Sequence, residues 1–245
     1  MKEISLVAPC LNEEENIPVL VERFLAAASA KGISAEVVLI DDGSTDNTWL
    51  AIEKEIANHG DCVVGVRHET NCGIPLGWIS GVNASSGKFV CLIDSDLQNP
   101  PESVFDLYNR YLTGDCDIVR GVRKPVEANP RSRVIMSKSL NGLLNLIFGM
   151  HSKDNKSGFL LGPREAMNTT VKHFGEYRHF QTFVGVSAHS HGYRVVEIDT
   201  PFLDRRAGVS FLAGNSRKVI FEVFKDIPQA AREYGWRFNK KKANS

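Results

Sequence analysis

The chain has 245 residues, enough for one large α/β domain with a full core. Lys and Arg number 29, as do Asp and Glu, so the formal net charge is zero, which argues against a general nucleic-acid binder with a basic surface. The five cysteines show no Cys-x-x-Cys spacing, which argues against zinc or redox work and is typical of reduced thiols in a cytosolic protein. No stretch reaches the roughly 18 apolar residues of a membrane span, and Pro9 interrupts the amino terminus too early for a signal peptide.

The first half of the chain alternates apolar runs with amphipathic segments. Buried strands are predicted over 4–8, 36–40, 62–66, 89–93 and 117–121. Helices are predicted between them, from residue 17, from about 45 to 58, over 77–85 and over 101–111. Ser44 or Thr45 is the expected cap of the second helix. Gly77 and Gly81 in the third helix indicate a close approach to the sheet or to a ligand. Alternation of this kind is typical of a parallel sheet.

The second half is less regular. It holds a basic loop over 120–133, a predicted helix over 137–149, a predicted strand over 194–198 and a loop that carries Arg205. Residues 213–245 are predicted to form an amphipathic helical tail. The apolar face of that tail consists of Ile220, Val223, Phe224 and Ile227. The tail is expected either to contact an anionic membrane surface or to pack on its own domain.

Two carboxylates follow the apolar run at 89–93. Asp94 and Asp96 are expected where a parallel strand ends, which is the usual place for a ligand crevice in an open α/β sheet. Residues two apart in an extended chain point the same way, so Asp94, Asp96 and Gln98 can converge on one hard cation. An isolated Asp-x-Asp string more often forms a turn or a helix cap, so the other motifs of the chain decide between these interpretations.

Four motifs follow one another over roughly the first half of the chain. They are Pro9-x-Leu-Asn-Glu13, Leu39-Ile-Asp-Asp-Gly-Ser-x-Asp46, Asn71-x-Gly73 and Asp94-Ser-Asp-Leu-Gln-x-Pro-Pro-Glu102. As a set they resemble family 2 glycosyltransferases of GT-A fold, and the last motif resembles polyprenyl-phosphate glycosyltransferases of the dolichyl-phosphate mannosyltransferase type. Later motifs follow the order of that subfamily: Gly121-Val-Arg123, Arg133-x-x-x-Ser137, Asp154-x-x-Ser-Gly-Phe159 and Phe202-x-x-Arg205-x-x-Gly208-x-Ser210.

The resemblance implies a fold, a domain division and site residues. The fold is α/β, with a Rossmann-like, mostly parallel central sheet flanked by helices. The domain spans 1–212, with a nucleotide-binding half over about 1–125 and an acceptor half over about 126–212. The residues implied for nucleotide binding are Pro9, Leu11, Glu13, Leu39, Asp41, Asp94 and Ser95. The implied ligands of Mg²⁺ or Mn²⁺ are Asp94, Asp96 and Gln98. The implied contacts of an acceptor phosphate are Arg123, Arg133, Ser137 and Arg205. The implied catalytic residues are Asp96, Arg123 and Arg205.

These roles predict a metal-dependent, inverting transfer of a sugar from a nucleotide-diphosphate donor to a polyprenyl phosphate. A cation on two carboxylates neutralises the charge that develops on the leaving diphosphate. A lipid phosphate is already an anionic nucleophile, which arginine can hold for in-line attack. We therefore expect a cytoplasmic protein that is peripheral at the cytoplasmic face of a membrane, without a nucleic-acid partner. The sequence does not indicate the base or sugar of the donor, or the oligomeric state.

Other functions stay open. Leu160 and Phe211 stand where the subfamily often carries Arg and Lys, so the acceptor can instead be a hydroxyl of a lipid-linked or cell-surface glycan, with Asp154 as the candidate general base. Nucleotidyl transfer onto a sugar phosphate ranks low, because the loop after the first strand is acidic and lacks glycine. A non-catalytic module that binds sugar nucleotides is a further alternative.

Overall fold

A computed structural model of the protein describes residues 1–123, 131–175, 177, 179–205 and 216–235, with 131–137 and 216–220 described in their backbone alone. The described strands form one seven-stranded sheet of order β3-β2-β1-β4-β6-β5-β7. The strands are β1 (Ile4–Cys10), β2 (Ala35–Asp42), β3 (Val63–His68), β4 (Phe89–Leu92), β5 (Ile118–Arg123), β6 (Leu160–Pro163) and β7 (Val195–Thr200). The helices are α1 (Ile17–Ala30), α2 (Thr48–His59), α3 (Ile74–Ala84), α4 (Val104–Tyr111), α5 (Arg131–Phe148), α6 (Arg164–Val171), α7 (Val184–Ser190) and α8 (Ser216–Tyr234).

The sheet grows in two directions from β1. This strand pairs in parallel with β2 on one side and with β4 on the other, and β3 pairs in parallel with β2. β6 is antiparallel to both of its neighbours, β4 and β5, whereas β7 is parallel to β5. The predicted mostly parallel sheet is confirmed, and β6 is an antiparallel strand that the sequence pattern did not indicate.

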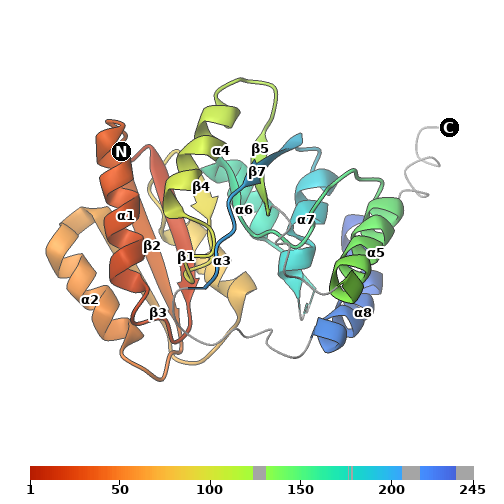
Figure 1. Ribbon diagram of the computed structural model, residues 1–245, viewed down its shortest axis with the longest axis horizontal. Helices are drawn as coiled ribbons and strands as arrows, with labels where there is room; N and C mark the ends of the chain where they lie inside the picture. The colour runs from red at the N-terminus through yellow and green to blue at the C-terminus, as the bar shows by residue number, and fades with distance from the viewer. Residues whose placement is uncertain (124–130, 176, 178, 206–215, 236–245) are drawn as a thin grey trace.

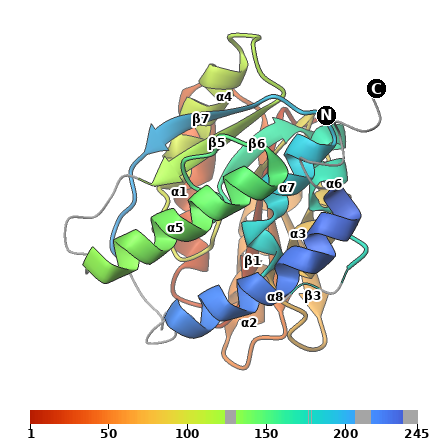
Figure 2. The same cartoon turned by 90° about the vertical axis from the view of Figure 1, so that its right-hand side faces the viewer.

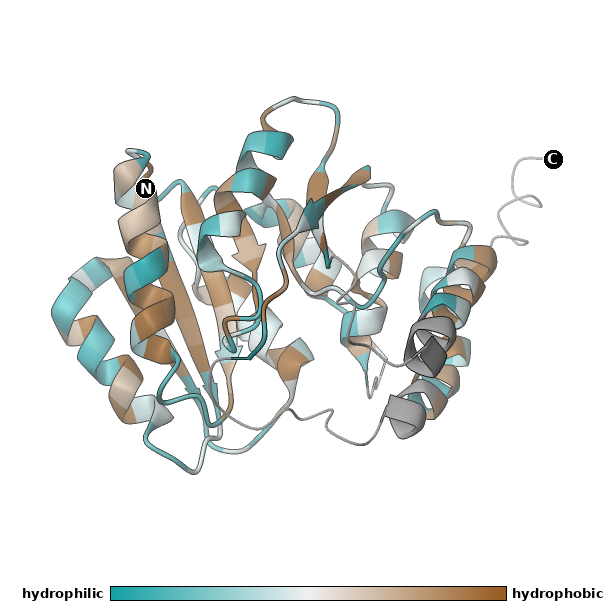
Figure 3. Cartoon of the chain, in the orientation of Figure 1, coloured by the Kyte–Doolittle hydropathy of each residue, from teal (hydrophilic) through white to brown (hydrophobic). Residues whose placement is uncertain are grey.

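Helices cover both faces of the sheet (Figure 1). α1, α2 and α4 pack on one face, where Leu20 and Phe24 of α1 are fully buried. α3, α6 and α7 cover the other face, and α5 and α8 lie beyond α7, side by side at that end of the molecule (Figure 2). The strands are mostly apolar, whereas the outer helix α2 is largely hydrophilic, as its position next to solvent requires (Figure 3).

The glycines of α3 allow the close approach that the sequence indicates. A Cβ atom on Gly77 would lie 2.9 Å from Cβ of Pro9, and one on Gly81 would overlap the side chain of Val7. Both contacts are with β1, so these glycines let α3 pack directly on the strand whose end carries Pro9.

The expected cap of α2 was wrong. The helix begins at Thr48 with Asn47 in the N-cap position. The two hydroxyl residues bond to the loop after β1 instead: Ser44 Oγ accepts from Asn12 N at 3.0 Å, and Thr45 N donates to Asn12 Oδ1 at 2.8 Å. They therefore join the first two motifs to each other.

Helix α8 packs on the domain. Its residues Val223 and Ile227 are buried in the same apolar core as α7. Phe224 was expected on the same face, but it is 45% exposed, and Phe221 is 72% exposed. The described helices include none that combines the length and the apolar composition needed to cross a membrane. Membrane contact by the tail stays a prediction, and the aromatic and basic residues after 235 lie outside the described residues.

Candidate active site

The carboxyl ends of β1 and β4 lie side by side where the sheet changes its direction of growth. β1 is followed in sequence by β2 and β3 on one side, whereas β4 pairs with β1 on the other. In open α/β sheets such a switch point is the usual ligand site. Ser95, after β4, donates a hydrogen bond of 3.0 Å from Oγ to Pro9 O near the end of β1. The structure thus brings the first and fourth motifs together.

Asp94 and Asp96 have different surroundings at this switch point. Asp96 is 6% exposed, and its Oδ1 accepts a hydrogen bond of 3.0 Å from Gln98 N. Asp94 is exposed and accepts no hydrogen bond from the described residues. Although its side chain reaches solvent, the surrounding protein limits its hydration, and this effect together with repulsion from Asp96 raises the pKa of Asp94 to about 6. Leu97 between Asp96 and Gln98 has a φ of 62°, a strained conformation for a branched residue.

The residues at this turn fit a divalent cation. Asp94, Asp96 and the Gln98 amide offer oxygen ligands, which Mg²⁺ and Mn²⁺ prefer. A cation would relieve the repulsion between the two carboxylates that contributes to the raised pKa of Asp94. Gln98 Nε2 donates to Leu203 O at 3.2 Å, so its Oε1 is the atom left to act as a ligand.

Arg205 connects the segment after β7 to the carboxylates at the end of β4. Its Nη2 donates to Asp96 Oδ2 at 3.0 Å, and its Nη1 donates to Glu13 Oε1 at 3.2 Å. Leu203 N also donates to Gln98 O at 2.8 Å, so the segment after β7 is fixed to the turn after β4. Three predicted site residues, from three separate motifs, therefore form one charged cluster.

Asp41 and Asp42 at the end of β2 have different hydrogen-bond partners. Asp42 accepts hydrogen bonds from the backbone of Cys72 and Gly73 at 2.9 and 2.7 Å, and so fixes the loop of the third motif. Asp41 is fully buried, and its Oδ1 accepts from Ser44 N at 3.0 Å. Its Oδ2 has no hydrogen-bond partner among the described residues, with Arg67 Nε 3.5 Å away. Because a buried carboxylate oxygen without a hydrogen bond is costly, Asp41 Oδ2 marks a place where a ligand can donate one.

The other residues predicted for nucleotide binding divide into two groups. Pro9 and Leu11 are half-buried at the end of β1 and in the loop after it, and Glu13 in that loop is 7% exposed. Burial raises the pKa of Glu13, although the hydrogen bond from Asn16 and the charge of Arg205 oppose this shift. Leu39 is fully buried in the core of the sheet, so its side chain packs below the site and does not face it.

Arg123 lies at the end of β5 in a fixed orientation. Its Nε and Nη2 donate to the two oxygens of Asp154 at 2.8 and 3.1 Å, and its guanidinium lies 5.3 Å from the ring centre of Phe202. Its charge and that of Arg205 both lower the pKa of Asp94, so both cations act on the carboxylate site. Arg133 and Ser137 lie on the part of α5 that is described by its backbone alone, and Gly208, Ser210 and Phe211 lie outside the described residues.

Sequence reasoning missed several contributors. It did not indicate that Phe202 covers Arg123 or that Leu203 holds Gln98, because these contacts join segments about 80 to 105 positions apart. It also missed that Asp42, His68 and Cys72 bring three ligand-type atoms within 4.8 Å of one another. These residues come from β2, β3 and the loop after β3, and only the pairing of the two strands brings them together.

The chain matches known sequences over most of its length. The model of the family described as glycosyl transferase family 2 matches residues 5–173. The undecaprenyl-phosphate 4-deoxy-4-formamido-L-arabinose transferase of Shewanella sediminis (strain HAW-EB3) is 34% identical over 207 residues, which are 84% of this chain and 61% of that protein. The transferase of the same name from Pectobacterium carotovorum subsp. carotovorum (strain PC1) is 30% identical over 213 residues, 86% of this chain and 62% of that protein. The chain therefore spans less than two thirds of the length of these curated relatives.

Solved structures share the fold. Glucosyl-3-phosphoglycerate synthase from Mycobacterium tuberculosis, in complex with Mn²⁺, uridine diphosphate and glucosyl-3-phosphoglycerate, superposes with a TM-score of 0.66 at 22% identity and covers 91% of this chain and 79% of its own. The same enzyme with phosphoglyceric acid gives a TM-score of 0.67 at 21% identity, with the same coverage. The likeness confirms the predicted GT-A fold. The relatives named above confirm the predicted resemblance to polyprenyl-phosphate glycosyltransferases, and the match over residues 5–173 shows that the chain belongs to glycosyl transferase family 2.

Proposed function

We propose that the protein transfers a sugar from a nucleotide-diphosphate donor to undecaprenyl phosphate or a related polyprenyl phosphate, with Mg²⁺ or Mn²⁺ as cofactor. One observation carries this proposal: Arg205, from the acceptor half of the chain, is hydrogen bonded to Asp96, a predicted ligand of the cation. The acceptor is supported by the names of the curated relatives, which are undecaprenyl-phosphate transferases.

The donor nucleotide is proposed to bind at the ends of β1 and β2. Asp41 Oδ2 is a buried acceptor that still lacks a donor among the described residues, so it suits a base N–H or a ribose hydroxyl. Pro9, Leu11 and Glu13 belong to the loop beside it. Leu39 supports this site from the core. Asp94 and Ser95 at the end of β4 would face the diphosphate end of the donor.

The carboxylates at the end of β4 are proposed to stabilise the leaving diphosphate through a bound cation. A divalent cation bound by Asp94, Asp96 and Gln98 would neutralise the negative charge that grows on the diphosphate as the bond to the sugar breaks. Asp96 has a second task, because it also orients Arg205. A cation bound to the Asp96 carboxylate would weaken its attraction for Arg205. The guanidinium could then also bind a phosphate oxygen.

The arginines are proposed to hold the acceptor phosphate. Arg123 is fixed by Asp154 and Phe202, and Arg205 by Glu13 and Asp96, so both planar guanidinium groups are preorganised. The resemblance adds Arg133 and Ser137 on α5 as further contacts. A phosphate oxygen held by these groups is already negative, and direct attack on the anomeric carbon inverts its configuration.

The position of Asp154 favours a phosphate acceptor over a glycan hydroxyl. A hydroxyl needs a general base, and Asp154 was the candidate. Both of its oxygens already accept hydrogen bonds from Arg123, so neither is left in place to take a proton from an acceptor hydroxyl. A phosphate acceptor requires no such base.

The lipid acceptor implies contact with a membrane surface. Three large apolar side chains are exposed on the neighbouring helices α5 and α8: Leu146, Phe221 and Phe224. Lys225 beside Phe224 can contact anionic head groups. We therefore include peripheral association with the cytoplasmic face of a membrane in the proposal.

The test is a transfer assay with a panel of radiolabelled nucleotide sugars. Purified protein is incubated with each donor, Mn²⁺ or Mg²⁺, and either undecaprenyl phosphate or an oligosaccharide acceptor. The proposal requires a butanol-soluble, acid-labile product with the lipid phosphate, and loss of this product when EDTA is added. Transfer to the oligosaccharide alone, or transfer to the lipid that EDTA leaves unchanged, would contradict the acceptor or the cofactor respectively.

A further inference from the structure

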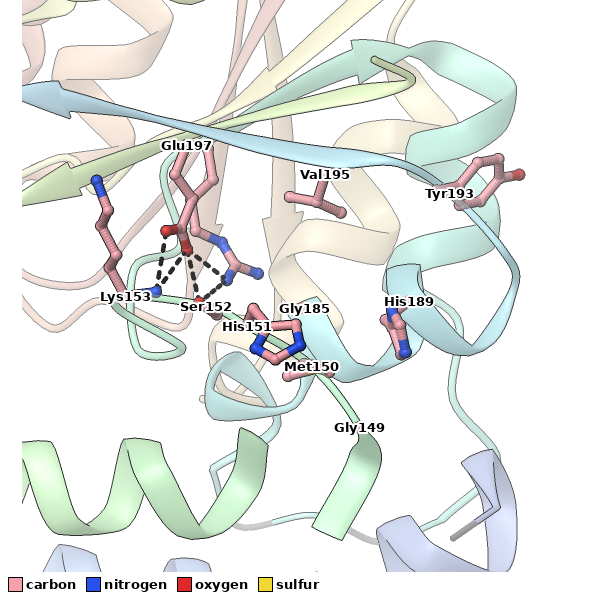
Figure 4. Close-up of a pocket in the computed structure, with 11 residues that line it drawn as sticks. Gly149, Met150, His151, Ser152, Lys153, Gly185, His189, Tyr193, Val195 and Glu197 are labelled. Carbon is pink, nitrogen blue, oxygen red and sulfur yellow. Dashed lines mark hydrogen bonds and ion pairs between the residues drawn. The ribbon is translucent and has the colours of Figure 1, made fainter. Parts of the chain in front are cut away.

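A cavity of about 400 Å³ opens between β7, α7 and the segment 149–153 that follows α5 (Figure 4). It does not include the residues of the candidate active site. Its walls come from segments that are distant in sequence: Arg120 of β5, the segment 149–153, and the neighbouring elements α7 and β7. Its lining includes four residues with basic side chains and one with an acidic side chain: Arg120, His151, Lys153, His189 and Glu197.

Arg120 in this cavity is a buried cation with unused hydrogen-bond donors. It is 1% exposed, and burial lowers its pKa while Glu197 and Asp154 raise it. Its Nη1 donates to Ser152 Oγ at 2.8 Å. Its Nε and Nη2 have no acceptor among the described residues. Buried donors are nearly always paired in proteins, so two unpaired donors on one guanidinium call for a partner.

Glu197 balances the charge of Arg120 but does not satisfy its donors. Arg120 Nη1 lies 3.7 Å from Glu197 Oε1, which is an ion pair and too long for a hydrogen bond. The carboxylate instead accepts from Ser152 Oγ at 2.6 Å and from Lys153 N at 2.9 and 3.0 Å. Its oxygens are therefore used to hold the segment after α5, and the guanidinium keeps its capacity to bind an acceptor.

Helix α7 leaves room for the guanidinium at one position. A Cβ atom on Gly185 would overlap Nη2 of Arg120. Glycine at this position lets the helix approach the strand while the arginine stays in place. The packing of α7 thus accommodates the Arg120 guanidinium inside the protein.

We propose that this cavity binds a small oxyanion, the phosphate or carboxylate group of a soluble metabolite or of a lipid head group, through Arg120. An oxygen acceptor matches the two unpaired donors, and a negative charge suits a guanidinium whose nearest carboxylate does not hydrogen bond to it. The guanidinium is almost fully buried, so the group that reaches it must be small, and the remainder of the ligand would occupy the open part of the cavity. Lys153 is exposed at the wall, and its side chain extends away from the guanidinium (Figure 4), so Arg120 is the group that would bind the anion.

The proposed anion is distinct from the acceptor phosphate. Arg120 and Arg123 lie three residues apart on β5 but bond to different partners, Ser152 and Asp154. Nε and Nη2 of Arg123 donate to a carboxylate, whereas Nε and Nη2 of Arg120 have no acceptor among the described residues. A variant at one arginine can therefore test this site without removing the other.

The experiment follows the Nε–H signal of Arg120 in ¹H–¹⁵N spectra of the full chain, identified by its loss in Arg120→Lys. Inorganic phosphate is titrated at constant ionic strength. Dihexanoyl phosphatidylglycerol, below its micelle concentration, is titrated separately. A saturable shift with phosphate assigns a soluble ligand, and a shift with the lipid alone assigns a head group. Both results support the site, and an unmoved signal in both titrations overturns it.

Two variants make the result specific. Arg123→Met removes the neighbouring arginine, and the shift at Arg120 should persist with an apparent affinity within threefold of that of the unmodified protein. Val195→Phe fills the cavity without altering Arg120, and the affinity should fall at least tenfold while the far-ultraviolet circular dichroism spectrum is kept. Loss of the shift in Arg123→Met, or its survival in Val195→Phe, would show that phosphate binds elsewhere. An unmoved Arg120 signal would overturn the anion site and would not alter the result of the transfer assay. The two proposals can therefore be overturned separately.

Discussion

Arg205 Nη2 donates a hydrogen bond of 3.0 Å to Asp96 Oδ2, across 109 positions of sequence. Asp96 thereby belongs both to the turn after β4 and to the segment after β7. The relationship explains why one carboxylate can influence the donor side and the acceptor side of the proposed reaction together.

Asp96→Asn tests this double role. The variant removes a ligand charge from the proposed cation site and leaves one acceptor oxygen where Gln98 N and Arg205 Nη2 now use two, so turnover should fall by about 10²- to 10³-fold. Mn²⁺ should no longer raise the melting temperature in the presence of nucleoside diphosphate. Asp106→Asn is the matched control, because Asp106 is an exposed carboxylate on α4. Equal turnover in the two variants would contradict the assignment of Asp96.

Arg123→Lys tests recognition of the acceptor phosphate. Lysine cannot reproduce the two-point contact with Asp154 or the stacking on Phe202, so KM for the lipid phosphate should rise about tenfold, which equals roughly 1.4 kcal/mol. KM for the donor should stay within twofold. Arg110→Lys breaks a similar two-point pair with Asp115 at the surface and should leave both constants unchanged. An equal rise in both KM values for Arg123→Lys would indicate a general loss of structure instead.

Gly43→Ala tests the turn after Asp41 and Asp42. Gly43 has a φ of 72°, and a Cβ atom there would lie 2.5 Å from the backbone carbon of Thr70. We expect a loss of about 2 to 3 kcal/mol in the free energy of unfolding, measured by urea denaturation, together with weaker nucleotide binding. Gly114→Ala is the control: its φ is 83°, but no atom lies within 4 Å, so about 1 kcal/mol should be lost. Equal losses would mean that contact with Thr70 is unimportant.

Moving the arginine from position 120 to position 160 tests the pairing of β5 and β6. The two residues are direct cross-strand partners, and Leu160 stands where the subfamily often carries arginine. Arg120→Leu should cost about 3 kcal/mol in the free energy of unfolding, because Glu197 loses its buried partner. Adding Leu160→Arg places a guanidinium on the same face of the sheet, within reach of Glu197, and should restore more than half of that loss. Urea denaturation of the single and double variants measures the coupling, and purely additive losses would show that the two positions do not substitute for each other.

Much of the nucleotide-binding half could be predicted from the sequence. Its strands are continuous apolar runs, and each is followed by a helix with one apolar face, so local periodicity specifies the elements and their alternation. The placement of Asp94 and Asp96 after a buried strand follows from the same pattern. The predicted cap at Ser44 or Thr45 failed because both hydroxyls are hydrogen bonded to a distant partner: Ser44 Oγ accepts from Asn12 N, and Thr45 Oγ1 donates to Asn12 Oδ1.

The elements of the second half could not be predicted in the same way, because they are stabilised by contacts between distant segments. The antiparallel strand β6 has only four residues, too few for a periodic signal, and it is fixed by its pairing with β4 and β5. α6 and α7 are also short, and the sequence pattern did not indicate them. The exposure of Phe224 beside the buried Val223 depends on which side of α8 meets the domain.

The sequence by itself determined the family resemblance, the α/β class and the carboxylates at the end of β4, because strand periodicity and motif order are local properties. Only the tertiary structure decided that Arg205 meets Glu13 and Asp96, that Asp154 is occupied by Arg123, and that Arg120 lies unsatisfied in a cavity of its own. Each of these depends on strand order and on the docking of distant segments, since the partner of a charged side chain is set by which elements the fold makes neighbours.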